Sequence, residues 1–318
     1  MQEYELNDGL SVRPRPAGHA RTSAAPRQRL PGWRWACLVL LLLLPAIAAG
    51  CEPRPNSTVD TEPPEVSVVV IAPALEEMAR AVAGPRAVVT VLLSPGDRLA
   101  AYRPDAAALA RINAADIVIL NGSEPWQRTG ATSELAMRRT VLLDDYRPKL
   151  PPTPADVPTL PGASAGAYLW LHPGVVALAA EGLAERLSGR YPDRRPEYFA
   201  NAERFAARMT RLKPPSNLPT RVMLTDARFT PLLAWAGVSW LIEPAELMPM
   251  TPAEARRVRT AAQAAGLRLL VLPGYVPEPA ARQIGRQTDL TPVRLNDLGS
   301  IDYAGYLRDT LPKLRVAE

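Results

Sequence analysis

Two blocks of short, continuously apolar runs, each alternating with helical patterns, constrain the fold of this chain more than any other feature. In the first block the apolar runs cover residues 66–71, 87–93 and 116–120, and helical patterns cover residues 75–82 and 104–114. Continuous β-branched runs of this length are typical of strands that are buried on both faces. Because strands that alternate with helices pair in parallel through right-handed crossovers, the block predicts one α/β lobe.

A second block repeats this alternation nearer the carboxyl end. Its clearest helix start is Thr251, which is followed by Pro252 at the first helical position and by Glu254 at the capping-box spacing, and Gly266 is expected to end this helix. The expected strands of the block cover residues 221–224, 239–242, 267–272 and 293–295. This block predicts a second α/β lobe.

A long helical stretch at residues 172–212, interrupted near Tyr191 and Pro192, joins the two blocks. Its second half carries one apolar stripe at helical spacing, which we interpret as a core-packing face rather than a surface for a partner helix. The stripe consists of Tyr198, Phe199, Ala202, Phe205, Ala206, Met209 and Leu212.

These patterns predict an α/β protein of two lobes, each with a mostly parallel sheet flanked by helices, joined by a long rigid helix. The total of 318 residues is enough for two lobes that each bury a core. We place the N-terminal lobe at residues 65–171, the linking helical segment at 172–217 and the C-terminal lobe at 218–318. A cleft is expected between the lobes, at the carboxyl ends of the strands, where ligands bind in such sheets.

The amino-terminal region has the pattern of an export signal. Residues 36–49 are apolar, follow several arginines and end in small residues. As a helix, fourteen residues would span only about 21 Å, which is short of a bilayer core. Residues 48–51 resemble a lipobox, which predicts a signal peptide at 1–50 and a lipid on Cys51, although an ordinary cleavage site before a cysteine would look similar. The polar, proline-rich residues 51–64 are then a flexible tether that holds an exported protein to the extracytoplasmic or periplasmic face of a membrane.

Composition and missing motifs exclude several other functions. The net charge of +5 comes mainly from the first fifty residues, which hold six arginines and three acidic residues and leave 31 basic against 29 acidic residues after them. Because those basic residues form no stripe, we expect no nucleic-acid partner. The cysteines are Cys37 and Cys51, so residues 52–318 can form neither a disulfide nor a thiolate metal site. Phosphate loops, dinucleotide fingerprints and serine hydrolase motifs are absent, and we expect no enzyme.

Several short segments, in this order and spacing, resemble the zinc- and manganese-specific solute-binding proteins of ABC transporters, and the resemblance covers residues 65–314. Members of that family have two α/β lobes linked by a long helix. The segments are Leu-Leu-Ser-Pro-Gly at 92–96, Tyr-Arg-Pro at 102–104, residues 114–122, Glu-Pro-Trp at 124–126, Leu-Trp-Leu-His-Pro at 169–173, residues 226–237 and Leu-Asn-Asp-Leu-Gly at 295–299.

The resemblance implies a metal site built from both lobes, usually of three histidines and one carboxylate. The matching positions here are Ala100, Tyr168, Asp226 and Asn296, so the three histidines are replaced. Asp226 and Asn296 retain oxygen donors and are the candidate metal ligands. A neutral phenol with a pKa of about 10 is a poor substitute for imidazole, so we do not expect a high-affinity zinc site of the family type.

Two of the cleft candidates have alternative interpretations. His172 lies four residues after Tyr168 and is either a replacement ligand drawn into the cleft or a packing residue at a helix start. Asp226 follows an expected strand and either binds the ligand or caps the next helix. Tyr102, Arg103 and Glu243 are further candidates at strand ends or in loops.

The resemblance implies an extracytoplasmic solute-binding lipoprotein of an ABC importer, a monomer that delivers its ligand to a permease and its ATPase. The ligand would be zinc or manganese held in an altered fashion, a metal chelate or a small polar molecule. The alternative is a structural or interaction module at the cell envelope that keeps the fold without transport.

Overall fold

The computed structural model describes residues 66–315, apart from 130–133 and 151–165. The chain divides into a unit Met1–Glu62 and a unit Pro63–Glu318, and the architecture below belongs to the second unit. The predicted signal peptide at 1–50 and tether at 51–64, including Cys51, lie outside the described residues. Within the described part, no helix combines the length and the apolar character that crossing a membrane requires.

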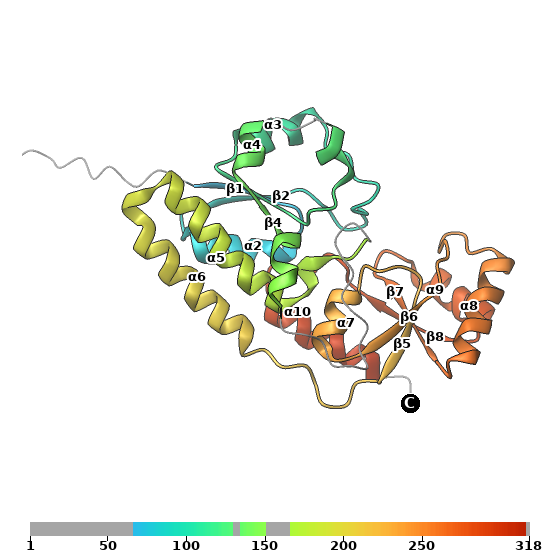
Figure 1. The fold of residues 1–318 in the computed structure, drawn as a ribbon. Coiled ribbons are helices and arrows are strands. Elements are labelled where there is room, and N and C mark those ends of the chain that lie inside the picture. Colours follow the sequence, from blue (N-terminus) through green and yellow to red (C-terminus); the bar gives the residue numbers. More distant parts are fainter. Residues whose placement is uncertain (1–65, 130–133, 151–165, 316–318) are drawn as a thin grey trace, which may run out of the picture. The chain divides into compact units, whose positions relative to one another are not determined.

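The first block of the sequence forms a four-stranded parallel sheet with the strand order β2-β1-β3-β4 (Figure 1). The three strands that the apolar runs predict are confirmed, whereas the three-residue strand β4 escaped prediction because it is too short to show a pattern. The elements are β1 Ser67–Val70, α2 Glu76–Ala83, β2 Val88–Val91, α3 Ala106–Ala114, β3 Ile117–Leu120, α4 Glu134–Arg138 and β4 Thr140–Leu142.

The second block forms another four-stranded parallel sheet, with the order β6-β5-β7-β8. The predicted capping box is confirmed, because the Thr251 hydroxyl accepts the Glu254 N–H while the Glu254 carboxylate accepts the Thr251 N–H. The elements are β5 Arg221–Leu224, α7 Thr230–Ala236, β6 Ser239–Ile242, α8 Pro252–Ala264, β7 Leu269–Pro273, α9 Glu278–Thr288, β8 Thr291–Leu295 and α10 Tyr303–Thr310.

The linking segment consists of two helices, α5 Pro173–Arg190 and α6 Arg195–Thr210, that pack side by side (Figure 1). The chain breaks between them at Tyr191 and the short helix Pro192–Arg194, where the sequence predicts the interruption. The stripe on α6 packs into the core, as predicted. With two parallel sheets, flanking helices and this joining segment, the predicted fold class is confirmed.

Two hydrophobic clusters fill the described part of the chain, and strand β5 shows how they are separated. Val222 and Leu224 belong to a large cluster that also contains the N-terminal sheet and α5, whereas Met223 belongs to a smaller cluster with α8 and α9. Since successive side chains of a strand point to opposite faces, the C-terminal sheet is buried on both sides. This explains why its strands have continuous apolar sequences.

Buried aromatic side chains connect the segment before α5 to the carboxyl-terminal part of the chain. The fully buried Trp170 donates its indole N–H to the carbonyl of Asp297 at 3.0 Å, and the Tyr303 hydroxyl donates to the carbonyl of Trp170 at 2.9 Å. Nearby, the Ala74 N–H donates to the carbonyl of Leu298 at 3.3 Å. These bonds join residues more than 120 positions apart and fix the loop after β8 against the N-terminal half.

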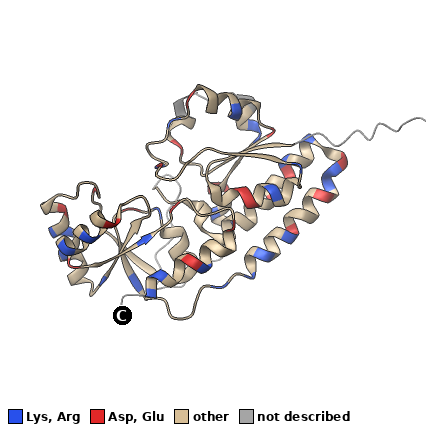
Figure 2. Ribbon diagram, turned by 180° about the vertical axis from the view of Figure 1, so that it is seen from behind, with Lys and Arg blue, Asp and Glu red and all other residues tan. Residues whose placement is uncertain are grey.

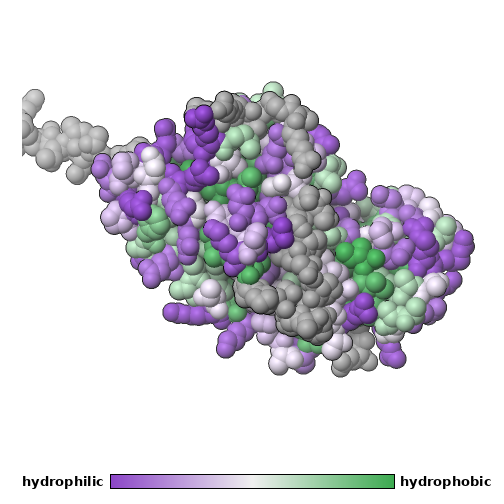
Figure 3. All heavy atoms as spheres, in the orientation of Figure 1, coloured by the Kyte–Doolittle hydropathy of each residue, from purple (hydrophilic) through white to green (hydrophobic). Residues whose placement is uncertain are grey.

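The surface is mixed in charge and polarity. Figure 2 shows acidic and basic residues interspersed along the helical pair that joins the sheets. On the face in Figure 3, hydrophilic residues surround small hydrophobic areas. Among the described residues, the large hydrophobic side chains that are exposed are Val88, Met248 and Ile301. Isolated exposed side chains of this kind are normal on a folded protein, so none of them by itself indicates a binding surface.

His172 caps helix α5. Its Nδ1 accepts hydrogen bonds from the N–H groups of Gly174 at 3.0 Å and Val175 at 3.3 Å, and the residue is 8% exposed. Burial lowers the pKa of His172 from 6.5 to about 4. The imidazole is therefore neutral at neutral pH, as an acceptor at a helix start must be.

The close contact at Gly299 gives a first prediction. Gly299 has a φ of 74°, and a Cβ added there would lie 2.5 Å from the Cβ of Ala74. We expect Gly299→Ala to lower the free energy of unfolding by about 2 to 4 kcal/mol, through left-handed backbone strain and overpacking. Urea unfolding measures this change. As a control, Gly189→Ala in α5 meets nothing within 4 Å and should be neutral or stabilising by up to about 1 kcal/mol. Equal midpoints for Gly299→Ala and the unmodified chain would contradict the prediction.

The cap at His172 gives a second prediction, on pH. Because the folded pKa of about 4 lies below the ordinary 6.5, the stabilisation is complete above about pH 6.5 and is lost as the pH falls toward 4. The loss attributable to this group is about 3 kcal/mol. His172→Asn keeps a capping acceptor but does not titrate, so urea unfolding between pH 7 and pH 4.5 should show a smaller loss for this variant. The same loss in both proteins would show that His172 does not carry the pH dependence.

Candidate functional site

The loops that follow the C-terminal strands bring charged and aromatic side chains to one edge of the sheet. Asp226 follows β5, Tyr275 follows β7 and Asp297 follows β8. Because the strands are parallel, their carboxyl ends meet at the same edge. The sequence therefore places a cluster of polar groups where α/β sheets bind ligands.

The guanidinium of Arg228 is the centre of this cluster. Its Nε lies 2.9 Å from both carboxylate oxygens of Asp226, and its Nη2 lies 2.8 Å from Asp226 Oδ2. On its other side, Nη1 donates to Asp297 Oδ2 at 2.7 Å. The side chain of Arg228 is 11% exposed, and that of Asp297 is 6% exposed. These are short, charge-assisted hydrogen bonds that hold a buried cation between two carboxylates.

Two tyrosine rings complete the surroundings of Arg228. The guanidinium carbon lies 5.4 Å from the centroid of the Tyr168 ring and 5.2 Å from the centroid of the Tyr275 ring. Its Nη2 also donates to the Tyr275 hydroxyl at 3.4 Å. A cation over an aromatic face is attracted by the ring quadrupole, and more strongly where water is excluded. Arg228 is therefore held by charge and by ring contacts together.

The protonation of the cluster follows from burial and from these contacts. Burial disfavours the charge of Arg228, but the hydrogen bonds and charge of Asp226 outweigh it and raise the pKa of Arg228. Burial raises the pKa of Asp297, against the opposing pull of Arg228. It also raises the pKa of Tyr168 to about 12, so this phenol is neutral at neutral pH.

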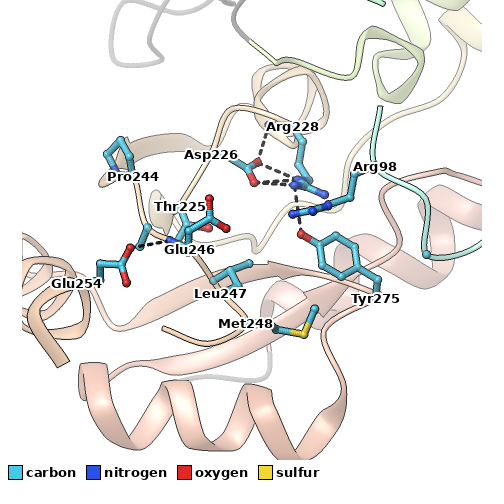
Figure 4. A pocket seen from close by; sticks show the side chains of 12 residues that line it. Arg98, Thr225, Asp226, Arg228, Pro244, Glu246, Leu247, Met248, Glu254 and Tyr275 are labelled. Carbon is cyan, nitrogen blue, oxygen red and sulfur yellow. Dashed lines mark hydrogen bonds and ion pairs between the residues drawn. The ribbon is translucent and has the colours of Figure 1, made fainter. Parts of the chain in front are cut away.

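A cavity of about 530 Å³ lies beside this cluster, and Figure 4 shows the side chains that line it. Arg98, from the loop after β2, points toward Arg228 and the Tyr275 hydroxyl. The loop after β6 supplies the opposite side of the cavity. The lining residues are Gly96, Arg98, Thr225, Asp226, Arg228, Pro244, Ala245, Glu246, Leu247, Met248, Glu254 and Tyr275.

The structure brings two of the five cleft residues predicted from sequence to Arg228. Asp226 lines the cavity and forms the ion pair, and it also accepts the Arg228 N–H at 3.0 Å. It is not the cap of α7, whose N-cap position is Phe229 without a side-chain bond. Tyr168 stacks against Arg228, and its hydroxyl accepts the Leu99 N–H at 3.3 Å. Both oxygen donors are thus engaged within the protein.

The other three predicted residues do not line the cavity. Asn296 uses its amide within its own loop, accepting the Leu298 N–H at 3.1 Å and donating to the Gly299 carbonyl at 2.6 Å. Ala100 is exposed and offers no side-chain donor or acceptor. His172 uses Nδ1 to cap α5.

The donor set of the cluster does not fit a bare divalent cation. Among the described residues, no group of three or more His, Cys, Asp or Glu side chains could hold a metal. Asp226 and Asp297 are both bound to a guanidinium, which would also repel a metal ion placed next to it. Imidazole and thiolate, the ligands that zinc prefers, are missing here.

Sequence reasoning missed the residue at the centre of the site. Arg228 and Asp297 stand directly beside predicted candidates, two positions after Asp226 and one after Asn296. Their positions after strands in the predicted second lobe were the available signal, but among the Lys and Arg residues that the structure describes only burial distinguishes Arg228.

Comparisons with known proteins agree with the fold. The family described as "ZnuA: Zinc-uptake complex component A periplasmic" matches residues 68–317. No curated protein sequence matches the chain. Its fold is similar to a crystal structure of ZnuA, at 18% identity and a TM-score of 0.61 over 80% of this chain and 99% of that one.

Two further solved structures are similar to this fold. Zn(II)-bound AdcA from Streptococcus pneumoniae is 17% identical with a TM-score of 0.61, over 80% of this chain and 58% of that one. FpvC from Pseudomonas aeruginosa, in complex with Mn²⁺, is 20% identical with a TM-score of 0.58, over 79% of this chain and 95% of that one. The family match spans most of the sequence and both sheets, so the chain belongs to the family of periplasmic zinc-uptake components, which are metal-binding transport receptors rather than enzymes.

Proposed function

We propose that this chain is the extracytoplasmic receptor of an ABC importer, anchored by a lipid on Cys51, and that its cleft takes a ligand other than a bare zinc or manganese ion. Membership of the zinc-uptake family and the two-sheet fold support the receptor role. The predicted export signal and lipobox support the anchor. The receptor delivers its ligand to a permease and its ATPase without doing chemistry on it.

The observation that carries the change of ligand is the buried ion pair of Arg228. A metal at this edge of the sheet would need Asp226, but that carboxylate accepts three close contacts from the guanidinium. Removing the guanidinium to make room would leave Asp297, whose side chain is 6% exposed, without a partner. An uncompensated buried carboxylate costs several kcal/mol. The protein thus supplies a covalently attached cation where a receptor for metal ions needs free ligands.

The absence of a metal site is a third prediction. Calorimetric titration of the purified full chain with zinc chloride and with manganese chloride should show no binding tighter than about 10 μM, since residues 66–315, as far as the structure describes them, form no cluster of suitable ligands. Asp226→Asn should leave the titration with either metal unchanged. The control is Asp289→Asn, which alters an exposed residue after α9 and should also leave it unchanged. Submicromolar zinc binding that Asp226→Asn abolishes and Asp289→Asn preserves would overturn the proposal.

Native mass spectrometry of the chain purified from its own cells tests the receptor role directly. The expected result is a complex that is heavier than the chain and its lipid, and that loses a small organic molecule on unfolding. A protein that carries the lipid alone would favour the non-transport module at the cell envelope.

The role of Arg228 in the architecture of the cleft gives a fourth prediction. Arg228→Met should lower the free energy of unfolding by about 3 to 5 kcal/mol, because Asp297 is left buried and unpaired. The double variant Arg228→Met with Asp297→Leu should recover most of this loss, since the partly exposed Asp226 can be hydrated. Urea unfolding measures both variants. The exposed Arg256→Met serves as the control and should stay within about 0.5 kcal/mol of the unmodified chain. Equal losses in the single and double variants would show that the ion pair does not hold the cleft.

A further inference from the structure

Two side chains of opposite charge face the cavity without an ion-pair partner. Arg98 lies in the loop after β2, and Glu246 lies in the loop after β6. Within the part of the chain that the structure describes, neither the guanidinium of Arg98 nor the carboxylate of Glu246 has a hydrogen bond or ion pair. They also form no ion pair with each other, although they line the same cavity. A ligand with charges at both ends would satisfy both.

Figure 4 shows how the charges are arranged around the space. The guanidinium of Arg98 points toward the hydroxyl end of Tyr275 in this view. Glu246 lies across the cavity, on the side where Asp226 stands. The cavity therefore has a positive side with a hydrogen-bonding phenol and a separate negative side.

The remaining charged groups of the cavity are already balanced or fixed. Arg228 is shared by Asp226 and Asp297, so this trio of side chains carries one excess negative charge, which adds to the side of Glu246. Glu254 is held by the hydroxyl and N–H of Thr251 and by the Glu246 N–H. Arg98 is consequently the cationic group of the cavity lining that is left for a ligand anion.

Apolar side chains next to the charged groups indicate what lies between the ends of the ligand. Leu247 and Met248 line the cavity together with Pro244. Met248 is 50% exposed, which is unusual among the large hydrophobic residues of the described part. Burying such a side chain against an apolar group of a ligand is favourable. The volume of about 530 Å³ is within the range of small-molecule sites.

We propose that this cavity binds a small zwitterion of the amino-acid class with an apolar side chain, its carboxylate on Arg98 and the Tyr275 hydroxyl and its ammonium facing Glu246. The inference rests on the proposed receptor function and names the class of ligand. Arg98 comes from the N-terminal half and the other groups come from the C-terminal half, so the ligand contacts both.

Calorimetric titration with single compounds tests this proposal. L-leucine and L-methionine should bind the full chain, and both should bind more tightly than glycine, which lacks the apolar group. N-acetyl-L-leucine lacks the ammonium and L-leucinamide lacks the carboxylate, so each should bind at least about 10-fold more weakly than L-leucine.

Substitutions assign the two charged ends. Arg98→Gln should weaken the binding of L-leucine by about 10- to 100-fold but leave the binding of L-leucinamide, which has no carboxylate, nearly unchanged. Glu246→Gln should weaken the binding of L-leucine by a similar factor but leave the binding of N-acetyl-L-leucine, which has no ammonium, nearly unchanged. Arg282→Gln in α9 and Glu203→Gln in α6 are exposed controls and should have no effect. Because Arg98 and Glu246 have no side-chain partners, their variants should fold normally.

The possible outcomes separate this proposal from the proposed function. If L-leucinamide binds as well as L-leucine, the ligand is a cation and the zwitterion is wrong. If no amino acid binds while zinc also fails to bind and a small molecule is released in native mass spectrometry, the amino-acid class is wrong and the receptor function stands. Tight zinc binding that depends on Asp226 would overturn both.

Discussion

The cleft of this protein depends on one buried cation. Arg228 is removed from water, and such a charge is tolerated only when carboxylates and other polar groups surround it. Asp226 and Asp297 supply the charge, and the rings of Tyr168 and Tyr275 supply the remaining contacts. These residues come from the ends of three strands and from the segment before α5. Their contacts with one guanidinium therefore join separate parts of the chain.

This arrangement is the basis of the proposed change of ligand within the zinc-uptake family. The similar structures include a Zn(II)-bound and a Mn²⁺-bound protein, whereas here the described residues form no cluster that suits a metal. Since Arg228 already satisfies the acidic residues at this edge of the sheet, a ligand has to use groups around it. Arg98 and Glu246 are such groups, and their opposite charges favour a molecule with two charged ends over a spherical ion.

Most of the fold could be predicted because its sequence signals involve only neighbouring residues. Features that depend on residues far apart in the sequence were missed. The residues of β5 and the capping box at Thr251 were predicted because apolar continuity and cap spacing need only a few neighbouring residues. Strand β4 has three residues and gives no such signal. The role of Arg228 depends on Asp297, 69 positions away, and a pairing at that separation leaves no local trace. The position of Asp226 at a strand end made it a candidate from sequence, but its ion pair with Arg228 could not be predicted.

The segment at residues 168–172 connects the surroundings of Arg228 to the start of the linking helices. Tyr168 stacks on Arg228, the Trp170 indole donates a hydrogen bond to the carbonyl of Asp297, and His172 caps the first turn of α5. The side chains of Tyr168 and Trp170 also contact each other, with ring centroids 4.5 Å apart. Because these residues are buried and close-packed, they join the surroundings of Arg228 and the loop after β8 to the start of α5. The segment that contacts the cation thus also fixes the start of the helix that joins the two sheets.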